Sequence, residues 1–160
     1  MCTTLNKEQE EKLLQIIADI EISRKQCLIN ISNHPSSGWS EEQKEGWGSI
    51  IDIPFSSIHY DSNFNAIADS IYDTIRYKHH RTPMDCTVMC QGQHVATFSI
   101  VALLLTLGFN VLSAYTERIV TENPDGTKLS KFVFGGYQVY KSRNIYNQFL
   151  HELEKIVKKE

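Results

Sequence analysis

The segment from Cys27 to Ser40 constrains the fold of this chain more than any other part of the sequence. A short apolar run, residues 27–31, stops abruptly in a polar loop, and Ser40 followed by Gln43 is a capping-box pattern that marks the start of a helix. A strand that ends in a polar loop just before a helix is typical of the first strand of an open α/β sheet. We therefore expect this loop to lie at the crevice where such sheets bind ligands.

The rest of the chain continues this alternation of strand and helix. Short apolar runs are separated by stretches whose apolar residues recur with helical spacing, and Gly108 is a typical helix-ending residue. The turn signal Asn123-Pro124-Asp125-Gly126 lies between two extended runs and predicts a β-hairpin, and Gly135-Gly136 predicts a bulge or a sharp bend. We expect strands at 27–31, 49–55, 86–91, 110–115, 119–121 and 129–134, and helices that begin near residues 6, 40, 63, 95 and 142.

Strands that alternate with helices predict an α/β fold, here a three-layer, Rossmann-like domain with a mostly parallel sheet and helices on both faces. Right-handed crossovers favour the strand order 2-1-3-4, with the hairpin as an antiparallel edge. The length fits one domain, 1–160, with an N-terminal helix within 1–25 and a C-terminal helix within 142–160. In this order the switch point, where successive strands begin to be added on the other side of strand one, lies between strands one and three.

The composition argues against duplex nucleic acid and membranes as partners. The net charge of −3 gives no reason to expect binding to duplex nucleic acid or to an anionic membrane. The longest apolar run, 95–107, is interrupted by polar residues and is shorter than the ~20 residues that span a bilayer. The acidic N-terminal segment is unlike a signal peptide. We therefore expect a reduced, cytoplasmic protein whose four cysteines, Cys2, Cys27, Cys86 and Cys90, are free thiols.

Three polar segments are expected to meet at the switch point, beyond the carboxyl ends of strands one, three and four. Hydroxyl and amide groups bind phosphate or ribose oxygens, and the N-terminus of a helix favours an anion. An arginine can bind a phosphate through two hydrogen bonds. The candidate ligand-binding residues are Ser32, Asn33, His34, Ser36, Ser37, Gly92, Gln93, His94, Thr116 and Arg118.

His34 and Glu117 are the candidate catalytic residues. A histidine can bind a phosphate when charged or transfer a proton when neutral. Each of the three segments also has a structural interpretation. The first can be a turn whose side chains satisfy backbone groups, the second a loop in which Gln93 or His94 caps a helix, and the third an exposed ion pair.

No metal site and no cofactor are expected. Cys86, Cys90 and His94 are equally spaced, but four strand residues span ~13 Å. That distance is too long for two sulfurs to share one zinc ion at about 2.3 Å each. The cluster His79-His80-Arg81 lies in a polar stretch and is interpreted as a solvated connection.

The pattern Leu28-Ile29-Asn30-Ile31-Ser32-Asn33-His34-Pro35, followed by a helix and by a small polar loop before a buried helix, resembles the small stand-alone CRISPR-associated Rossmann-fold (CARF-like) proteins. The resemblance covers residues 27–118. It implies a homodimer that binds a cyclic oligoadenylate second messenger across its two-fold axis in antiviral defence, and some members, the ring nucleases, cleave that messenger. By position it implies ligand contacts from Ser32, Asn33, His34 and the 91–94 loop. The three segments contain no lysine, which cleaving relatives often use, so the resemblance favours binding over cleavage.

Several classes of function remain open at the level of the sequence. The first is a nucleotide-binding sensor, and the second is a metal-independent phosphodiesterase that aligns a ribose 2′-hydroxyl with the neighbouring phosphate. The third is a small nucleoside- or nucleotide-processing enzyme of the transferase or glycosidase type, with Glu117 as its carboxylate. The fourth is a non-catalytic interaction protein. The fold alone does not choose among them.

Overall fold

The sheet has five strands in the order β2-β1-β3-β4-β5, which confirms the expected order and the hairpin at the edge. The structure is a computed structural model that describes residues 4–159, apart from the side chains of 143–146. In chain order the elements are α1 (Lys7–Arg24), β1 (Leu28–Ser32), a 3₁₀ turn (Ser36–Gly38), α2 (Glu41–Lys44), β2 (Ile50–Pro54), α3 (Phe64–Asp73) with a π-helical turn (Thr74–Lys78), β3 (Thr87–Cys90), α4 (His94–Thr106), β4 (Asn110–Glu122), β5 (Lys128–Val139) and α5 (Arg143–Lys158).

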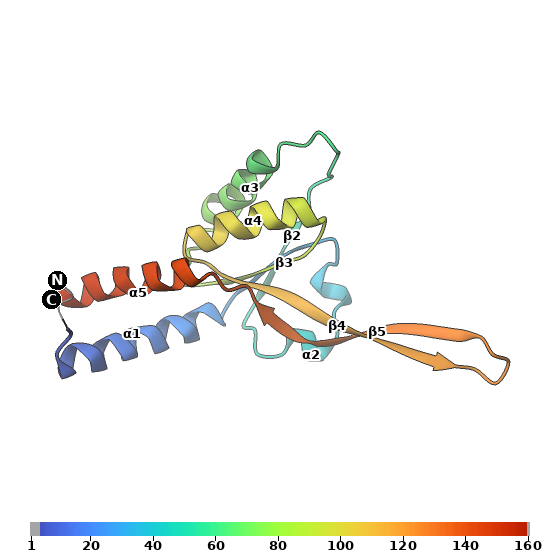
Figure 1. Cartoon of the computed structure of the whole chain (residues 1–160), viewed down its shortest axis with the longest axis horizontal. Helices are drawn as coiled ribbons and strands as arrows, with labels where there is room; N and C mark the ends of the chain where they lie inside the picture. The colour runs from blue at the N-terminus through green and yellow to red at the C-terminus, as the bar shows by residue number, and fades with distance from the viewer. Residues whose placement is uncertain (1–3, 160) are drawn as a thin grey trace.

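The first four strands are parallel, and β5 pairs antiparallel with β4. On one face of the sheet, α3 and α4 cover a core that includes Ile29, Ile31 and Val88 (Figure 1). On the opposite face, Leu28 and Met89 pack under Trp39 and Trp47, which belong to the segment that contains α2. The expected α/β fold with helices on both faces is thus confirmed.

The two faces explain where the switch point lies. The connection from β1 to β2 passes over the face covered by α2, whereas the connections through α3 and α4 pass over the other face. Right-handed crossovers on opposite faces carry the chain in opposite directions from β1. The loops after β1 and β3 therefore start side by side at the carboxyl edge and leave over opposite faces of the sheet. A crevice between two such loops is the usual ligand site of an open α/β sheet.

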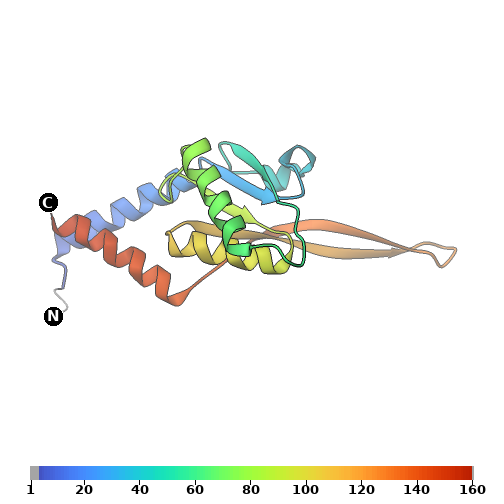
Figure 2. The same cartoon turned by 90° about the horizontal axis from the view of Figure 1, so that it is seen from above.

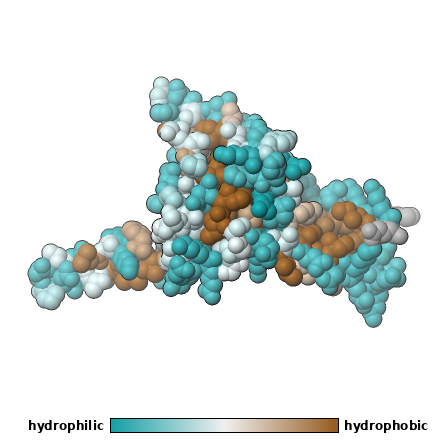
Figure 3. Space-filling view, turned by 180° about the vertical axis from the view of Figure 1, so that it is seen from behind, coloured by the Kyte–Doolittle hydropathy of each residue, from teal (hydrophilic) through white to brown (hydrophobic). Residues whose placement is uncertain are grey.

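The first and last helices project together from the amino-terminal end of the sheet, as Figures 1 and 2 show. The helix expected to begin near residue 6 is α1, and a capping box holds its start, because Asn6 Oδ1 accepts from Gln9 N and Gln9 Oε1 accepts from Asn6 N. No residue of α1 is buried, while Leu153 and Val157 of α5 are. Seen from behind, hydrophobic side chains gather over this helix pair (Figure 3).

The β4–β5 hairpin projects from the other end of the molecule, beyond the carboxyl edge of the parallel strands (Figure 1). We call residues 116–134 the arm. The sequence divided this part of β4 into two strands, and that expectation was wrong, because Asn110–Glu122 is one continuous strand. The predicted bulge is confirmed. Tyr115 pairs with Gly136 and Thr116 with Phe134, so Gly135 is the extra residue.

Three cysteines, Cys27, Cys86 and Cys90, are buried free thiols, and Cys2 lies outside the described residues. Burial raises the pKa of Cys86 and of Cys90 to about 12, so both stay protonated near neutral pH. Within residues 4–159 no helix is long and apolar enough to cross a membrane.

Arg24, the last residue of α1, ties the projecting helices to the sheet. Its Nε donates to the carbonyl of Pro83 at 2.8 Å, and its Nη2 donates to the carbonyl of Gly108 at 2.9 Å. Its guanidinium carbon lies 4.9 Å from the centre of the Phe149 ring of α5, within the range of a cation–π contact. Burial lowers the pKa of Arg24, but an arginine keeps its charge in proteins.

We predict that Arg24→Gln lowers the free energy of unfolding by about 1.5–3 kcal/mol, the usual value of hydrogen bonds made by a charged group. Urea denaturation followed by circular dichroism measures it. Lys25→Gln at the adjacent exposed position is the control and should change stability by less than ~0.5 kcal/mol. Equal stability of the two variants would show that Arg24 does not anchor the helices.

Candidate functional site

The loop after β1 is built around one buried polar side chain, Asn30, which is 1% exposed. Its Nδ2 donates to the carbonyl of His34 at 2.9 Å and to Oδ1 of Asp52 at 2.7 Å. Its Oδ1 accepts from the hydroxyl of Ser32 at 2.8 Å. Buried amides require such partners, so Asn30 holds the loop in one shape.

Asp52, in the neighbouring strand β2, fixes the far side of the same loop. Its carboxylate accepts from the backbone N–H of Ser36 at 3.1 Å and from the Ser36 hydroxyl at 2.9 Å. The indole N–H of Trp39 closes the loop by donating to the carbonyl of His34 at 3.0 Å. The loop is therefore ordered by its own hydrogen bonds.

This network separates the predicted ligand-binding residues into two groups. Ser32 is 6% exposed, and its hydroxyl is used by Asn30 and by the N–H of His34. Ser36 is likewise engaged with Asp52, so both serines support the loop. Asn33, His34 and Ser37 are exposed, and their side chains have no partner among residues 4–159. These three are the side chains of this loop that a ligand can reach.

The loop between β3 and α4 lies beside the first loop. Cys90 at the end of β3 pairs with Ile31, and the N–H of Gln91 donates to the carbonyl of Ile31 at 3.0 Å. Gln93 caps α4, because its Oε1 accepts from the N–H of Ala96 at 2.8 Å. The N–H groups of His94 and Val95 in the first turn make no hydrogen bond within the described chain. Such free N–H groups, together with the helix dipole, favour an anion.

Gly92 is required for packing within the chain. A Cβ atom built on it would lie 2.6 Å from Cε2 of Phe55, whose ring is 7% exposed and belongs to the core. The sequence named Gly92 as a candidate ligand-binding residue. The structure shows that its lack of a side chain also makes room for the Phe55 ring, while Gly92 itself stays exposed.

The third predicted segment does not join the other two. Thr116, Glu117 and Arg118 lie inside β4. The sequence analysis expected this strand to end at residue 115, just before them. By register Ser113 is level with Cys90, so Arg118 lies five strand residues, or ~17 Å, beyond the switch point. Nε and Nη2 of Arg118 donate to the hydroxyl of Ser130 across the hairpin. The polar residues 116–118 suggested a loop, but in the structure they pair with 132–134 of β5 and continue the antiparallel hairpin.

Sequence reasoning missed three residues of this edge. Asn30 and Asp52 are polar residues within apolar strand runs, and that interruption was the available signal. His59 lies in the loop after β2, exposed, with its N–H donating to Ser62. Exposed histidines therefore lie in the loop after β1 (His34), in the loop after β2 (His59) and at the first residue of α4 (His94).

The chemistry available at this edge is that of an anion site. Amide, hydroxyl and imidazole groups and the free N–H groups of α4 face solvent, while the carboxylate of Asp52 is occupied by Asn30 and Ser36. Among residues 4–159 no group of three or more histidine, cysteine or carboxylate side chains is placed to hold a metal ion. The arrangement can bind phosphate oxygens by hydrogen bonds and, at charged histidines, by ion pairs.

We predict that Gly92→Ala lowers the free energy of unfolding by about 1–3 kcal/mol, because the new methyl group overlaps the Phe55 ring. Gly38→Ala, in the loop after β1, is the matched control, since a Cβ there meets nothing within 4 Å. The double variant Gly92→Ala with Phe55→Leu should be less destabilised than the sum of its two single changes. Strict additivity in urea denaturation would show that the two residues do not compete for space.

Comparison with known proteins assigns most of the chain to a protein family. A family model described as the uncharacterized protein MJ1673 family matches residues 26–138. No curated protein and no solved structure matches the chain. The matched span begins just before β1 and ends within β5, so it contains all the loops of the carboxyl edge. On this match, the chain belongs to the MJ1673 family.

Proposed function

We propose that this protein binds a nucleotide-type anion at the carboxyl edge of its sheet, as a cytoplasmic, CARF-like sensor of a cyclic oligoadenylate second messenger in CRISPR antiviral defence. The observation that carries the proposal is the loop after β1. Its hydrogen bonds are completed by Asn30, Asp52 and Trp39, which leaves Asn33, His34 and Ser37 exposed beside the N-terminus of α4. A preordered set of donors lowers the entropic cost of binding.

The polar character of this edge supports a phosphate-containing ligand. The exposed side chains of His34 and His94 and the first turn of α4 supply donors and partial positive charge, and the one carboxylate of the network is occupied. Exposed amide and hydroxyl groups can also bind ribose oxygens. Thr116, Glu117 and Arg118 are not part of the proposed site, because they lie along the arm.

Self-association as a homodimer belongs to the proposal, and the arm supports it. A two-stranded hairpin is at best marginally stable on its own in water. The arm nevertheless exposes large apolar side chains, with Val120 51%, Leu129 62% and Phe132 66% exposed. Its charges balance, with Glu117, Glu122 and Asp125 against Arg118, Lys128 and Lys131, so a second copy fits it better than a strongly charged partner.

We assign His34 to binding rather than to chemistry. Catalysis by proton transfer requires a reacting group and a second partner. Glu117, the other residue predicted to be catalytic, lies at the base of the arm, four strand residues, or ~14 Å, beyond the switch point. A histidine that acts as general acid or base contributes ~10²–10⁴-fold to a rate. Removal of a binding histidine instead weakens affinity.

We predict that cyclic tetra-adenylate raises the melting temperature of the protein and that His34→Ala weakens its binding about tenfold, as expected for one charged hydrogen bond. Isothermal titration calorimetry measures the affinity, and chromatography of the bound nucleotide measures cleavage. His151→Ala, an exposed histidine on α5, is the control and should bind like wild type. Adenosine monophosphate, a single nucleotide, is the comparison ligand and should bind more weakly than cyclic tetra-adenylate.

Two outcomes would contradict this proposal. If no mono-, di- or cyclic oligonucleotide raises the melting temperature, the carboxyl edge is not a nucleotide site. If cleavage occurs and His34→Ala slows it by ~10²-fold or more with affinity kept, His34 is a catalytic residue and the protein is a phosphodiesterase.

A further inference from the structure

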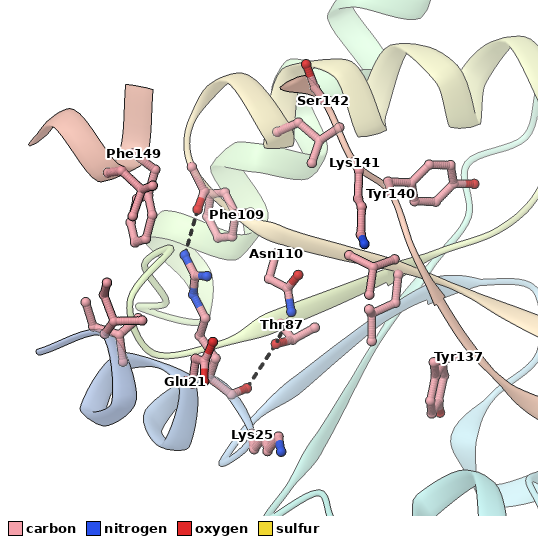
Figure 4. Close-up of a pocket in the computed structure, with 18 of the residues that line it drawn as sticks. Glu21, Lys25, Thr87, Phe109, Asn110, Tyr137, Tyr140, Lys141, Ser142 and Phe149 are labelled. Atoms are coloured by element: carbon pink, nitrogen blue, oxygen red, sulfur yellow. Dashed lines mark hydrogen bonds between the residues drawn. The ribbon is translucent and has the colours of Figure 1, made fainter. Parts of the chain in front are cut away.

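A cleft of about 1240 Å³ lies at the opposite end of the strands from the carboxyl edge. Figure 4 shows its floor, which includes the first residues of β3 and β4, Thr87 and Asn110. Its sides come from α1, from the first part of α5 and from the segment between β5 and α5. The volume exceeds the ~300–1,000 Å³ that is usual for small-molecule sites.

The cleft is mainly apolar, with a polar floor. Asn110 Nδ2 donates to Oγ1 of Thr87 at 3.4 Å, and the Thr87 hydroxyl donates to the carbonyl of Arg24 at 3.2 Å. A ligand that filled this space would therefore contact chiefly apolar and aromatic groups. The principal ones that expose surface are Ile17, Ile20, Trp47, Tyr137, Val139 and Leu150.

The charged side chains of the cleft are mostly cationic. Arg24, Lys25 and Lys141 line it together with one carboxylate, that of Glu21. Arg24 is held by two carbonyls, but among residues 4–159 the ammonium groups of Lys25 and Lys141 have no hydrogen-bond or ion-pair partner. In Figure 4 the amine of Lys141 points toward the strands of the floor. The protein as a whole has a net charge of −3, so the cleft differs in sign from the rest of the molecule.

We propose that this cleft is a second binding site, for an amphipathic anion with an apolar body and a single acidic head group, such as a long-chain carboxylate. The apolar walls remove the body of the ligand from water, which favours binding in proportion to the apolar area buried. Lys141 binds the head group, and Lys25 adds attraction at the rim. The site is independent of the nucleotide site, because it lies at the other end of the strands.

The fluorescent sulfonate 1-anilinonaphthalene-8-sulfonate, itself an amphipathic anion, serves as the probe, with laurate as competitor below its micellar concentration. Laurate should displace the probe, whereas butyrate, which lacks a long apolar body, and dodecanol, which lacks the charge, should require at least about tenfold higher concentrations. Equal displacement by dodecanol and laurate would overturn the role of the cations. Binding of laurate only in phosphatidylglycerol vesicles would overturn a site for the dissolved molecule.

Two pairs of variants locate the site. Lys141→Gln should weaken laurate binding by about tenfold, the value of one charged hydrogen bond, and Lys131→Gln on the arm should not. Val139→Trp should block the cleft, while Val120→Trp on the arm is its control, because the two valines are 49% and 51% exposed. Unchanged laurate affinity in both Lys141→Gln and Val139→Trp would exclude this cleft.

Val139→Trp also separates the two proposals. Its binding of cyclic tetra-adenylate should equal that of wild type, and His34→Ala should keep its affinity for laurate. If a second copy of the chain fills the cleft instead, the amount of probe bound per protomer will fall as protein concentration rises, and the proposal fails.

Discussion

The buried amide of Asn30 in the internal strand β1 is the constraint on which the functional edge depends. A buried amide without partners costs roughly 1–3 kcal/mol, so the chain around Asn30 has to supply both donors and acceptors. Ser32, the His34 carbonyl and Asp52 do so, at 2.8, 2.9 and 2.7 Å. The same bonds fix where the β1 loop turns and which of its side chains face solvent.

The two ends of the parallel strands have different physical characters. At the carboxyl edge, short polar loops expose imidazole, amide and hydroxyl groups beside the N-terminus of α4. At the amino-terminal end, α1 and α5 project from the sheet, and an apolar cleft remains between these helices and the strand ends. Among residues 4–159 the ammonium groups of Lys25 and Lys141 in this cleft have no partner. A phosphate-rich ligand suits the first environment, and an apolar anion suits the second.

The arm shows where a local pattern misled. Polar residues at 116–118 suggested a loop, yet cross-strand pairing with 132–134 continues the ribbon through them. The contact of Gly92 with the Phe55 ring is likewise one that the sequence did not indicate. In both cases the deciding neighbour is distant in sequence, and a pattern confined to a few consecutive residues contains no information about it.

The sequence by itself determined the α/β class, the strand order, the capped start of α1 at Asn6 and the bulge at Gly135-Gly136, because periodicity, caps and turn residues are local properties. It also located the β1 loop at the switch point. Only the tertiary structure decided that Ser32 and Ser36 support this loop while Asn33 and His34 are exposed, since that division depends on Asp52 in a neighbouring strand. The cleft under α1 and α5 likewise has no local signature, because its lining comes from both ends of the chain and meets only after folding.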